Sequence, residues 1–318
     1  MSDTFVKINT LSVSKNLADF VKNELLPGLD VNEKDFWDGF DKSVNEFAPI
    51  NKNLLEIRET LQSEIDLWFK KNRNKEFNHQ EYKDFLKEIG YLKKEGDDFK
   101  IETKNLDSEI SSIAGPQLVV PIMNSRYTLN AANARWVSLY DSLYGTDIIE
   151  SEETGSQKYD PLRGQEVIKY ARDFLNDHFS INEIHWKDIT GFKIEPNNLK
   201  ILKDNKEFEL KDKNKFIGYR GEPNNPTTII LENNNLKIEI IINPKAFSAV
   251  QDAAGISDII IESAISTICD NEDSVAAVDS EDKILCYRNW LGLMKGTLKS
   301  VFEKDGKTLE RKLNPDRS

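Results

Sequence analysis

Three carboxylates stand within four positions just after an apolar run: Asp270, Glu272 and Asp273. The run, 264–269, predicts a strand, and in parallel α/β architectures reacting groups lie where strands end and loops begin. Three negative charges at a strand end are costly unless a cation or hydrogen-bond donors offset them. Because the loop 270–273 itself contains neither His nor Cys, these oxygen ligands favour Mg²⁺ over zinc, and nearby carboxylates can orient the waters that Mg²⁺ keeps.

A second interpretation of this loop needs no metal. Acidic residues near the N-terminus of a helix stabilise its dipole, and Asp279 and Glu281 precede an amphipathic stretch that ends near residue 295. The pattern alone leaves the metal-facing loop and the helix-capping loop both open.

Arg126 and Tyr127 follow a second apolar run in the same way. A guanidinium offers forked donors that suit a phosphate, and a phenol ring offers a flat apolar face for a purine. A surface arginine beside a half-buried tyrosine is the alternative. Two strand-to-helix units with polar tips therefore suggest one split active site.

The histidines and the glycine-rich segments do not indicate a metal site or a phosphate-binding loop. His79, His178 and His185 have neither metal-ligand spacing nor a cysteine partner, so we interpret them as structural. The glycines in 218–223 and 292–296 have the wrong spacing for a phosphate-binding loop of the Rossmann or Walker type.

The elements that must position these residues begin with helices. Apolar spacing predicts one over 14–25, a second over 36–47 that ends near Pro49, and a third over 53–68. A fourth begins with the capping pair Asn78 and Glu81 and ends at Gly90.

A parallel strand buried on both faces is predicted over 116–123, followed by a helix that runs to a C-terminal cap at Gly145. After an exposed loop over 150–164 and a helix over 163–176, the segment 184–243 has the pattern of β structure, with 193–215 as a solvated face. Its clearest hairpin has a second arm in which Ile238 and Ile240 point inward while Lys237 and Glu239 point outward. A final hairpin is predicted over 297–313.

Composition narrows the class of protein. The 318 residues suffice for about two domains, and the net charge of −12 argues against nucleic acids and anionic membranes as partners. Cys269 and Cys286 fit reduced, buried thiols better than a disulfide. The first residues lack the pattern of a signal peptide, and the apolar stretch 256–269 is interrupted by Asp258 and Glu262. We therefore expect a cytoplasmic protein that does not enter the membrane.

Two long segments closely resemble the bacterial malate synthase G family: AGPQLVVPIMNSRYTLNAANARWVSLYDSLYGTDII and ESAISTICDNEDSVAAVDSEDKILCYRNWLGLMKG. The resemblance continues in family order through DPLRGQEVIKYARDFL, FIGYRGE, LENNNLKIEI and KLNPDR, so it covers essentially the whole chain. It implies an enzyme that condenses acetyl-CoA with glyoxylate and water to give malate and CoA, with Mg²⁺ holding the glyoxylate.

The fold that this resemblance implies is α/β, with an N-terminal helical clasp, a TIM (β/α)8 barrel and an inserted α/β domain rich in antiparallel strands. Residues 1–112 would form the clasp, 113–134 and 263–295 the first barrel strands and helices, and 135–262 with 296–318 the inserted domain. The first two barrel strands would be 116–123 and 265–269.

The family's site residues carry over by position. The residues that match acetyl-CoA contacts are Val119, Arg126, Tyr127, Ser274 and Arg311. Asp270, Glu272 and Asp273 match the acidic loop that orients metal-bound waters and the glyoxylate pocket, with Glu272 the foremost of them and acting through water. In the family mechanism a carboxylate takes a methyl proton from acetyl-CoA, and the enolate attacks glyoxylate polarised by Mg²⁺ and an arginine.

The family is more than twice as long as this chain, and its catalytic arginine, base carboxylate and direct metal ligands lie further on. The resemblance therefore implies the N-terminal part of a malate synthase G, a protein that is monomeric at full length. Alone, this part should be inactive, with uncovered barrel surface and an aggregation-prone strand edge. The missing C-terminal half would be its partner. The alternative is a non-catalytic CoA-binding or interaction module.

Overall fold

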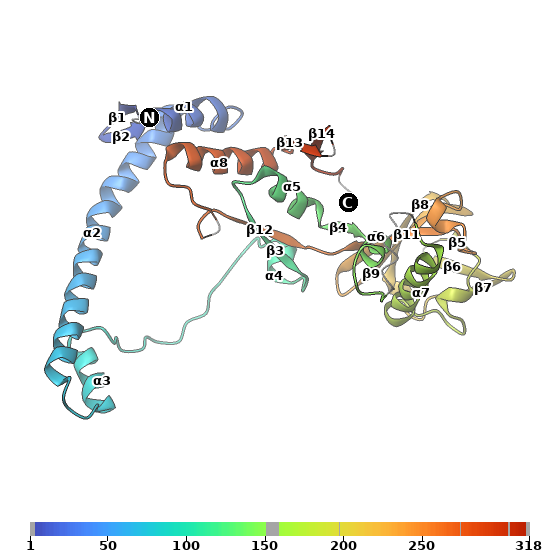
Figure 1. Ribbon diagram of the computed structural model, residues 1–318, viewed down its shortest axis with the longest axis horizontal. Coiled ribbons are helices and arrows are strands. Elements are labelled where there is room, and N and C mark those ends of the chain that lie inside the picture. Colours follow the sequence, from blue (N-terminus) through green and yellow to red (C-terminus); the bar gives the residue numbers. More distant parts are fainter. Residues whose placement is uncertain (1–3, 151–158, 197, 274, 305, 316–318) are drawn as a thin grey trace. The chain divides into compact units, whose positions relative to one another are not determined.

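The computed structural model describes residues 4–150, 159–196, 198–273, 275–304 and 306–315 (Figure 1). The chain divides into two compact units. The first comprises 1–104 with 278–284, and the second comprises 105–277 with 285–318. None of the described helices is long and apolar enough to cross a membrane.

The first unit is mainly helical. Its elements are the hairpin β1 (Phe5–Ile8) and β2 (Leu11–Ser14), α1 (Lys15–Phe20), the π-helical turn η1 (Val21–Leu25), α2 (Glu33–Asn72) and α3 (His79–Glu88). The hairpin turn is fastened to α2, because Asn9 Nδ2 donates to Asp38 Oδ1 at 2.9 Å and the amide of Thr10 donates to Asp41 Oδ1 at 3.1 Å.

Helix α2 is a single helix of 40 residues, so the predicted end near Pro49 and the new helix from residue 53 were wrong (Figure 1). Proline removes one backbone donor and crowds the preceding turn, but it does not prevent the turns on either side from forming. The long flanking stretches outweigh that local cost. The side chain of Asn32 caps the helix by accepting from the amide of Asp35 at 2.8 Å.

Helix α3 folds back on the end of α2, as Figure 1 shows. Its predicted cap is confirmed, since Asn78 Oδ1 accepts from the amides of Gln80 and Glu81 at 3.0 and 3.2 Å. Gly90 follows with a positive φ of 75°, which fits its predicted place at the helix end. The two helices share the aromatic cluster of Trp68, Phe69, Phe77, Tyr82 and Phe85.

The second unit contains the predicted pair of parallel strands. β3 (Gln117–Pro121) and β12 (Ser266–Asp270) are hydrogen-bonded in parallel, with Val119 opposite Ile268. The prediction of burial on both faces was wrong, because Val119 is 64% and Ile268 50% exposed. In the described part of the chain these two strands form a sheet of their own, and no barrel closes around them.

Further elements flank these two strands in sequence: α4 (Ser108–Ser111), α5 (Ser125–Asn133), α8 (Ser280–Met294), whose residues up to 284 belong to the first unit, and the hairpin of β13 (Lys299–Lys304) and β14 (Lys307–Lys312). This hairpin confirms the one predicted over 297–313.

The helix predicted to run from α5 to Gly145 is interrupted. α5 ends at Asn133, the strand β4 (Trp136–Ser138) follows, and the short helix α6 (Leu139–Tyr144) completes the segment. Pairing with the inserted sheet satisfies the backbone of 136–138 and overrides its helical periodicity. The predicted end at Gly145 is confirmed, because its amide donates to the carbonyl of Asp141 at 2.9 Å.

The inserted part is built from α7 (Pro161–His178) and two antiparallel sheets. The larger has the order β4-β11-β10-β9-β8 and the smaller β5-β6-β7. Their strands are β5 (Gly191–Glu195), β6 (Asn198–Lys203), β7 (Lys206–Phe208), β8 (Phe216–Glu222), β9 (Asn225–Asn233), β10 (Leu236–Ile242) and β11 (Ile256–Glu262). Three 3-10 turns join them: η2 (Trp186–Asp188), η3 (Lys213–Lys215) and η4 (Phe247–Ala249).

The predicted hairpin of β9 and β10 is confirmed, with Asn234 and Asn235 at positive φ in its turn. Ile238 and Ile240 point into the core, as expected. Glu239 was predicted to face outward into solvent but is only 1% exposed. Its carboxylate is buried because β10 lies in the middle of the sheet, and Arg220 of β8 pairs with it at 3.0 Å.

Candidate functional site

Two polar segments follow the carboxyl ends of β3 and β12: Arg126 with Tyr127, and the acidic loop 270–273. Just beyond the strands, the amide of Ile122 donates to the carbonyl of Asp270 at 3.0 Å. The turn that leads to Arg126 therefore lies beside the start of the acidic loop, at the edge where parallel α/β sheets usually carry their sites. The predicted split site is consistent with this placement.

A small buried cluster supports this edge. Ile122, Val275 and Cys286 of α8 form its buried core. Asn289, one turn further along α8 and 6% exposed, donates from Nδ2 to the carbonyls of Ile122 and Met123 at 2.9 and 3.1 Å. One side chain thus satisfies two carbonyls that the end of β3 leaves without a ladder partner.

Arg126 and Tyr127 occupy the first turn of α5. The side chain of Asn124 caps this turn by accepting from the amide of Tyr127 at 3.1 Å. Both side chains are exposed. The Arg126 guanidinium carbon lies 5.6 Å from the centroid of the Tyr127 ring and 5.0 Å from that of Phe302 on β13.

Arg311 lies on β14 with its side chain exposed. The hairpin is fastened to the far end of α5 by Asn133, which donates from Nδ2 to the carbonyl of Lys312 at 3.0 Å and accepts from the amide of Asn314 at 2.8 Å. α5 and the hairpin therefore form one supported surface. Val119 lies in the middle of β3 with its side chain exposed, and Ser274 lies outside the described residues.

The three acids form an ordered turn. Asp270 ends β12 and accepts from the amide of Glu272 through Oδ1 at 2.9 Å, while Glu272 and Asp273 are exposed. Within the described ranges, no three His, Cys, Asp or Glu side chains are grouped so that they could hold a metal ion. These oxygen donors therefore do not make a binding set by themselves and could meet a cation only through water or with further ligands.

The helix-capping interpretation named Asp279 and Glu281. Asp279 Oδ1 accepts from the amide of Asp282 at 2.9 Å and so caps α8, and Glu281 lies in the first turn of that helix. Cys269 and Cys286 are both free thiols, but only Cys286 is buried as expected, because Cys269 is partly exposed. Partial burial raises the pKa of the Cys269 thiol. Cys269 is therefore protonated at neutral pH and is a poor nucleophile.

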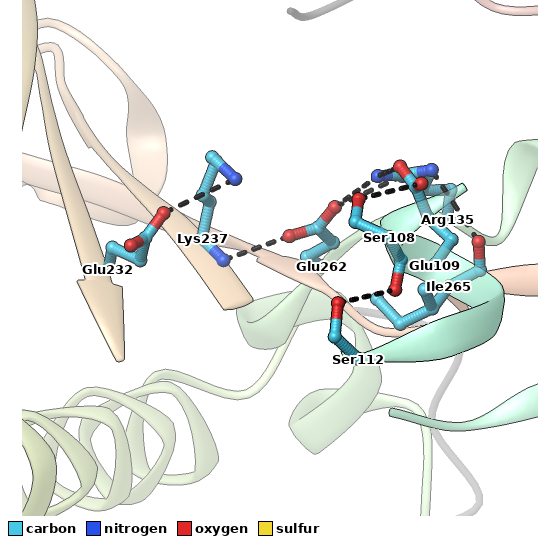
Figure 2. A network of polar contacts seen from close by, with 8 residues as sticks. All are labelled: Ser108, Glu109, Ser112, Arg135, Glu232, Lys237, Glu262 and Ile265. Carbon is cyan, nitrogen blue, oxygen red and sulfur yellow. Dashed lines mark hydrogen bonds and ion pairs between the residues drawn. The ribbon is translucent and has the colours of Figure 1, made fainter. Parts of the chain in front are cut away.

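A polar joint connects the inserted strands to the opposite end of the parallel pair, where Ile265 precedes β12 and accepts from Arg135 (Figure 2). Arg135 Nη2 binds Glu262 Oε1 at 2.6 Å and Glu109 Oε1 of α4 at 3.2 Å. Glu262 is buried, and its other oxygen accepts from the amide of Lys237 on β10 at 2.9 Å. Hydrogen bonds from the Glu109 amide, the Ser108 hydroxyl and Arg135 lower the pKa of the Glu109 carboxyl.

Sequence reasoning missed two residues that support the site, Asn289 and Phe302, and a third, Arg135, that holds the opposite end of the parallel pair. Asn289 falls one helical turn after the apolar Cys286, and an amide on a buried helix face usually has a specific partner. Such a pattern could have identified it. Phe302 contacts Arg126 from far along the chain, and Arg135 pairs with Glu262 across 127 positions of sequence, so nothing in their immediate neighbours indicates these partners.

Comparison with known families matches two parts of the chain. Residues 16–79 match the family model described as "Malate synthase, N-terminal domain", and residues 159–233 match "Malate synthase G, alpha-beta insertion domain". The second match covers most of the inserted strands from α7 to β9.

Curated relatives match nearly the whole chain. A malate synthase G from Halalkalibacterium halodurans is 45% identical over 320 aligned residues, which cover 99% of this chain and 44% of the relative. Malate synthases G from Corynebacterium efficiens and Corynebacterium glutamicum are each 44% identical and cover 98% and 96% of this chain, respectively, and 42% of the relative in both cases. The chain therefore spans less than half the length of these relatives.

Proposed function

Because this chain is homologous to the N-terminal part of malate synthase G over nearly its whole length, we propose that it acts in malate synthesis, the condensation of acetyl-CoA with glyoxylate and water to give malate and CoA. In this proposal the chain supplies the acetyl-CoA-binding surface and the acidic loop of the glyoxylate pocket.

The observation that carries the proposal is the parallel pair of β3 and β12. It joins Arg126 and Tyr127 on one side to Asp270, Glu272 and Asp273 on the other, across 149 positions of sequence between the paired residues Gln117 and Ser266. A cationic, aromatic surface beside an acidic loop suits a substrate with phosphates and a purine at one end and a reacting acyl group at the other.

Acetyl-CoA would bind across α5 and the hairpin. Arg126 and Arg311 offer forked donors to its phosphates, and Tyr127 offers a ring face to the purine, with Val119 and Ser274 as further contacts. The hairpin strands carry five lysines and arginines against two glutamates. This local excess of positive charge would attract an anionic ligand although the chain as a whole carries a net charge of −12.

The rest of the site would come from sequence outside these 318 residues. We propose that β3 and β12 are the first two strands of a (β/α)8 barrel and that further strands cover their exposed faces. This is supported by the exposure of Val119 and Ile268 and by the greater length of the relatives. The base carboxylate and the catalytic arginine would lie on those strands.

We propose Mg²⁺ as the cofactor, held mainly by residues outside this chain. The three loop acids would orient its waters, with Glu272 foremost, which agrees with a donor set that consists of carboxylates without His or Cys. When bound, the ion would polarise the glyoxylate aldehyde.

We also propose a cytoplasmic location, which the free thiols support.

The test is thiol release from acetyl-CoA by the purified chain, with and without glyoxylate and Mg²⁺. It is repeated after co-expression with the C-terminal part of the Halalkalibacterium halodurans relative, which supplies the region that this chain does not cover. We expect no glyoxylate-dependent release from the chain alone and clear release from the pair. The matched variant Glu272→Gln should reduce release by the pair, while Glu281→Gln on α8 should not.

Two outcomes would contradict the proposal. Release by the chain alone would place the base and the metal ligands among Asp270, Glu272 and Asp273. Binding of acetyl-CoA by the pair without any release would instead support a CoA-binding module.

A further inference from the structure

Phe302 connects the hairpin to the first turn of α5. Its ring centroid lies 5.0 Å from the guanidinium carbon of Arg126, closer than the 5.6 Å of the neighbouring Tyr127 ring. Phe302 is only partly exposed, whereas Arg126 is exposed. The guanidinium therefore has two ring contacts that restrict it, one from its own helix and one from a strand far along the chain.

The register of the hairpin places Arg311 on the same side. Residues directly opposite in an antiparallel pair share a face, as do residues two apart along a strand. Phe302 is opposite Leu309, and Ser300 is opposite Arg311. Phe302 and Arg311 consequently belong to one face of the hairpin, and the contact with Arg126 shows that this face is directed to α5.

The position of this face is fixed independently of Phe302. Asn133 holds the hairpin end through the carbonyl of Lys312 and the amide of Asn314. Replacing the Phe302 ring should therefore release the Arg126 side chain without detaching the hairpin from α5.

We propose that Phe302 is a positioning residue for nucleotide binding, whose ring holds the Arg126 guanidinium so that its donors and those of Arg311 meet the phosphates of one ligand. The inference rests on the proposed binding of acetyl-CoA. An unrestrained arginine loses side-chain entropy when a ligand orders it, and a side chain that is already held loses less.

The test compares binding of acetyl-CoA with binding of S-acetylpantetheine, which lacks the nucleotide and its phosphates. Titration calorimetry is done on the chain, alone and paired with the complementing part used above. Phe302→Leu keeps an apolar side chain but removes the ring, so we expect acetyl-CoA affinity to fall about two- to fivefold. Affinity for acetylpantetheine should stay unchanged, and Phe302→Tyr should restore acetyl-CoA affinity.

Leu309→Ala is the matched control, because Leu309 lies opposite Phe302 on the same face but has no ring. Equal losses in Phe302→Leu and Leu309→Ala, or no rescue by tyrosine, would overturn the inference in favour of simple packing.

A direct signature separates this inference from the proposed function. If the wild-type protein does not bind acetyl-CoA, the proposed function fails, and the NMR signal of the Arg126 side-chain N–H decides the role of Phe302. We expect a ring-current shift of that signal in the wild type and in Phe302→Tyr that becomes smaller in Phe302→Leu, where only the Tyr127 ring remains. The same shift in all three proteins would overturn the inference.

Discussion

Asn289 shows how one side chain can hold the turn that leads to Arg126. Its amide donates to the carbonyls of Ile122 and Met123, four and three residues before Arg126. A buried amide without these partners, or buried carbonyls without the amide, would each carry an unsatisfied polar group. The turn before α5 therefore depends on a residue of α8.

Asn289→Ala should lower the free energy of unfolding by about 1–3 kcal/mol, because two carbonyls lose their donor. Asn289→Asp should cost more, since it also brings a buried carboxylate against those carbonyls. Chemical denaturation measures both. Asn130→Ala, at an exposed position of α5, is the control and should change stability by less than about 0.5 kcal/mol. Similar values for Asn130→Ala and Asn289→Ala would mean that the Asn289 contacts contribute little.

At the scale of elements, α2 can be tested directly, because the sequence predicted a helix end near Pro49 and the structure has one continuous helix there. Pro49→Ala restores a backbone donor within a continuous helix and removes a clash with the preceding turn, a change worth up to about 3 kcal/mol. Amide exchange around residues 45–55 should therefore slow by at least tenfold. Ala48→Gly is the opposing control and should speed it. Unchanged exchange in Pro49→Ala would indicate two helices that meet at Pro49.

Elements with local signals could be predicted from the sequence. The Asn78 cap, the hairpin turn at Asn234 and Asn235, and the two parallel strands were confirmed, because turn residues and apolar runs determine them within a few positions. The break in the helix after Asn133 could not be predicted, because it depends on pairing with β11, more than a hundred residues away. Burial of Glu239 likewise depends on Arg220, which lies on another strand.

The candidate site followed a similar pattern. Placement of Arg126 and of the acidic loop at adjoining strand ends agrees with the rule for parallel strands. Its supports, Asn289 and Phe302, lie on elements whose packing the sequence does not encode locally. The grouping of α5 with the β13–β14 hairpin was likewise visible only in the structure.

At the scale of the whole second unit, the joint at Arg135 determines how the inserted strands meet the parallel pair (Figure 2). Arg135→Met leaves the buried Glu262 carboxylate without its cation, so we expect the free energy of unfolding to fall by about 2 kcal/mol. This loss is smaller than for a fully buried ion pair because Arg135 is partly exposed. Limited proteolysis at 133–136 and 262–265 should become faster. Lys237→Met, which keeps the amide that Glu262 uses, is the matched control; equal effects would contradict a role for the joint.

The lowered pKa of the Glu109 carboxyl makes the stability of this joint depend on pH. Because the folded pKa lies below the ordinary value, the contribution of Glu109 is present above that ordinary value and is lost as the pH falls through the lowered pKa. In Glu109→Gln this acid-dependent part of the stability should disappear.

The adjoining ends of the inserted segment have a consequence for how the chain folds. The amide of Ser263 donates to the carbonyl of Arg135 at 2.8 Å, so once the insertion has folded its two ends already touch. The partners Gln117 and Ser266, 149 positions apart, are then separated by an effective loop of only about twenty residues. Loop-closure entropy changes by about 0.6 kcal/mol for each doubling of length, so this shortening lowers the cost of pairing by about 2 kcal/mol. A folded insertion thus brings β3 and β12 close together before they pair. We therefore expect the insertion to fold before this strand pair forms.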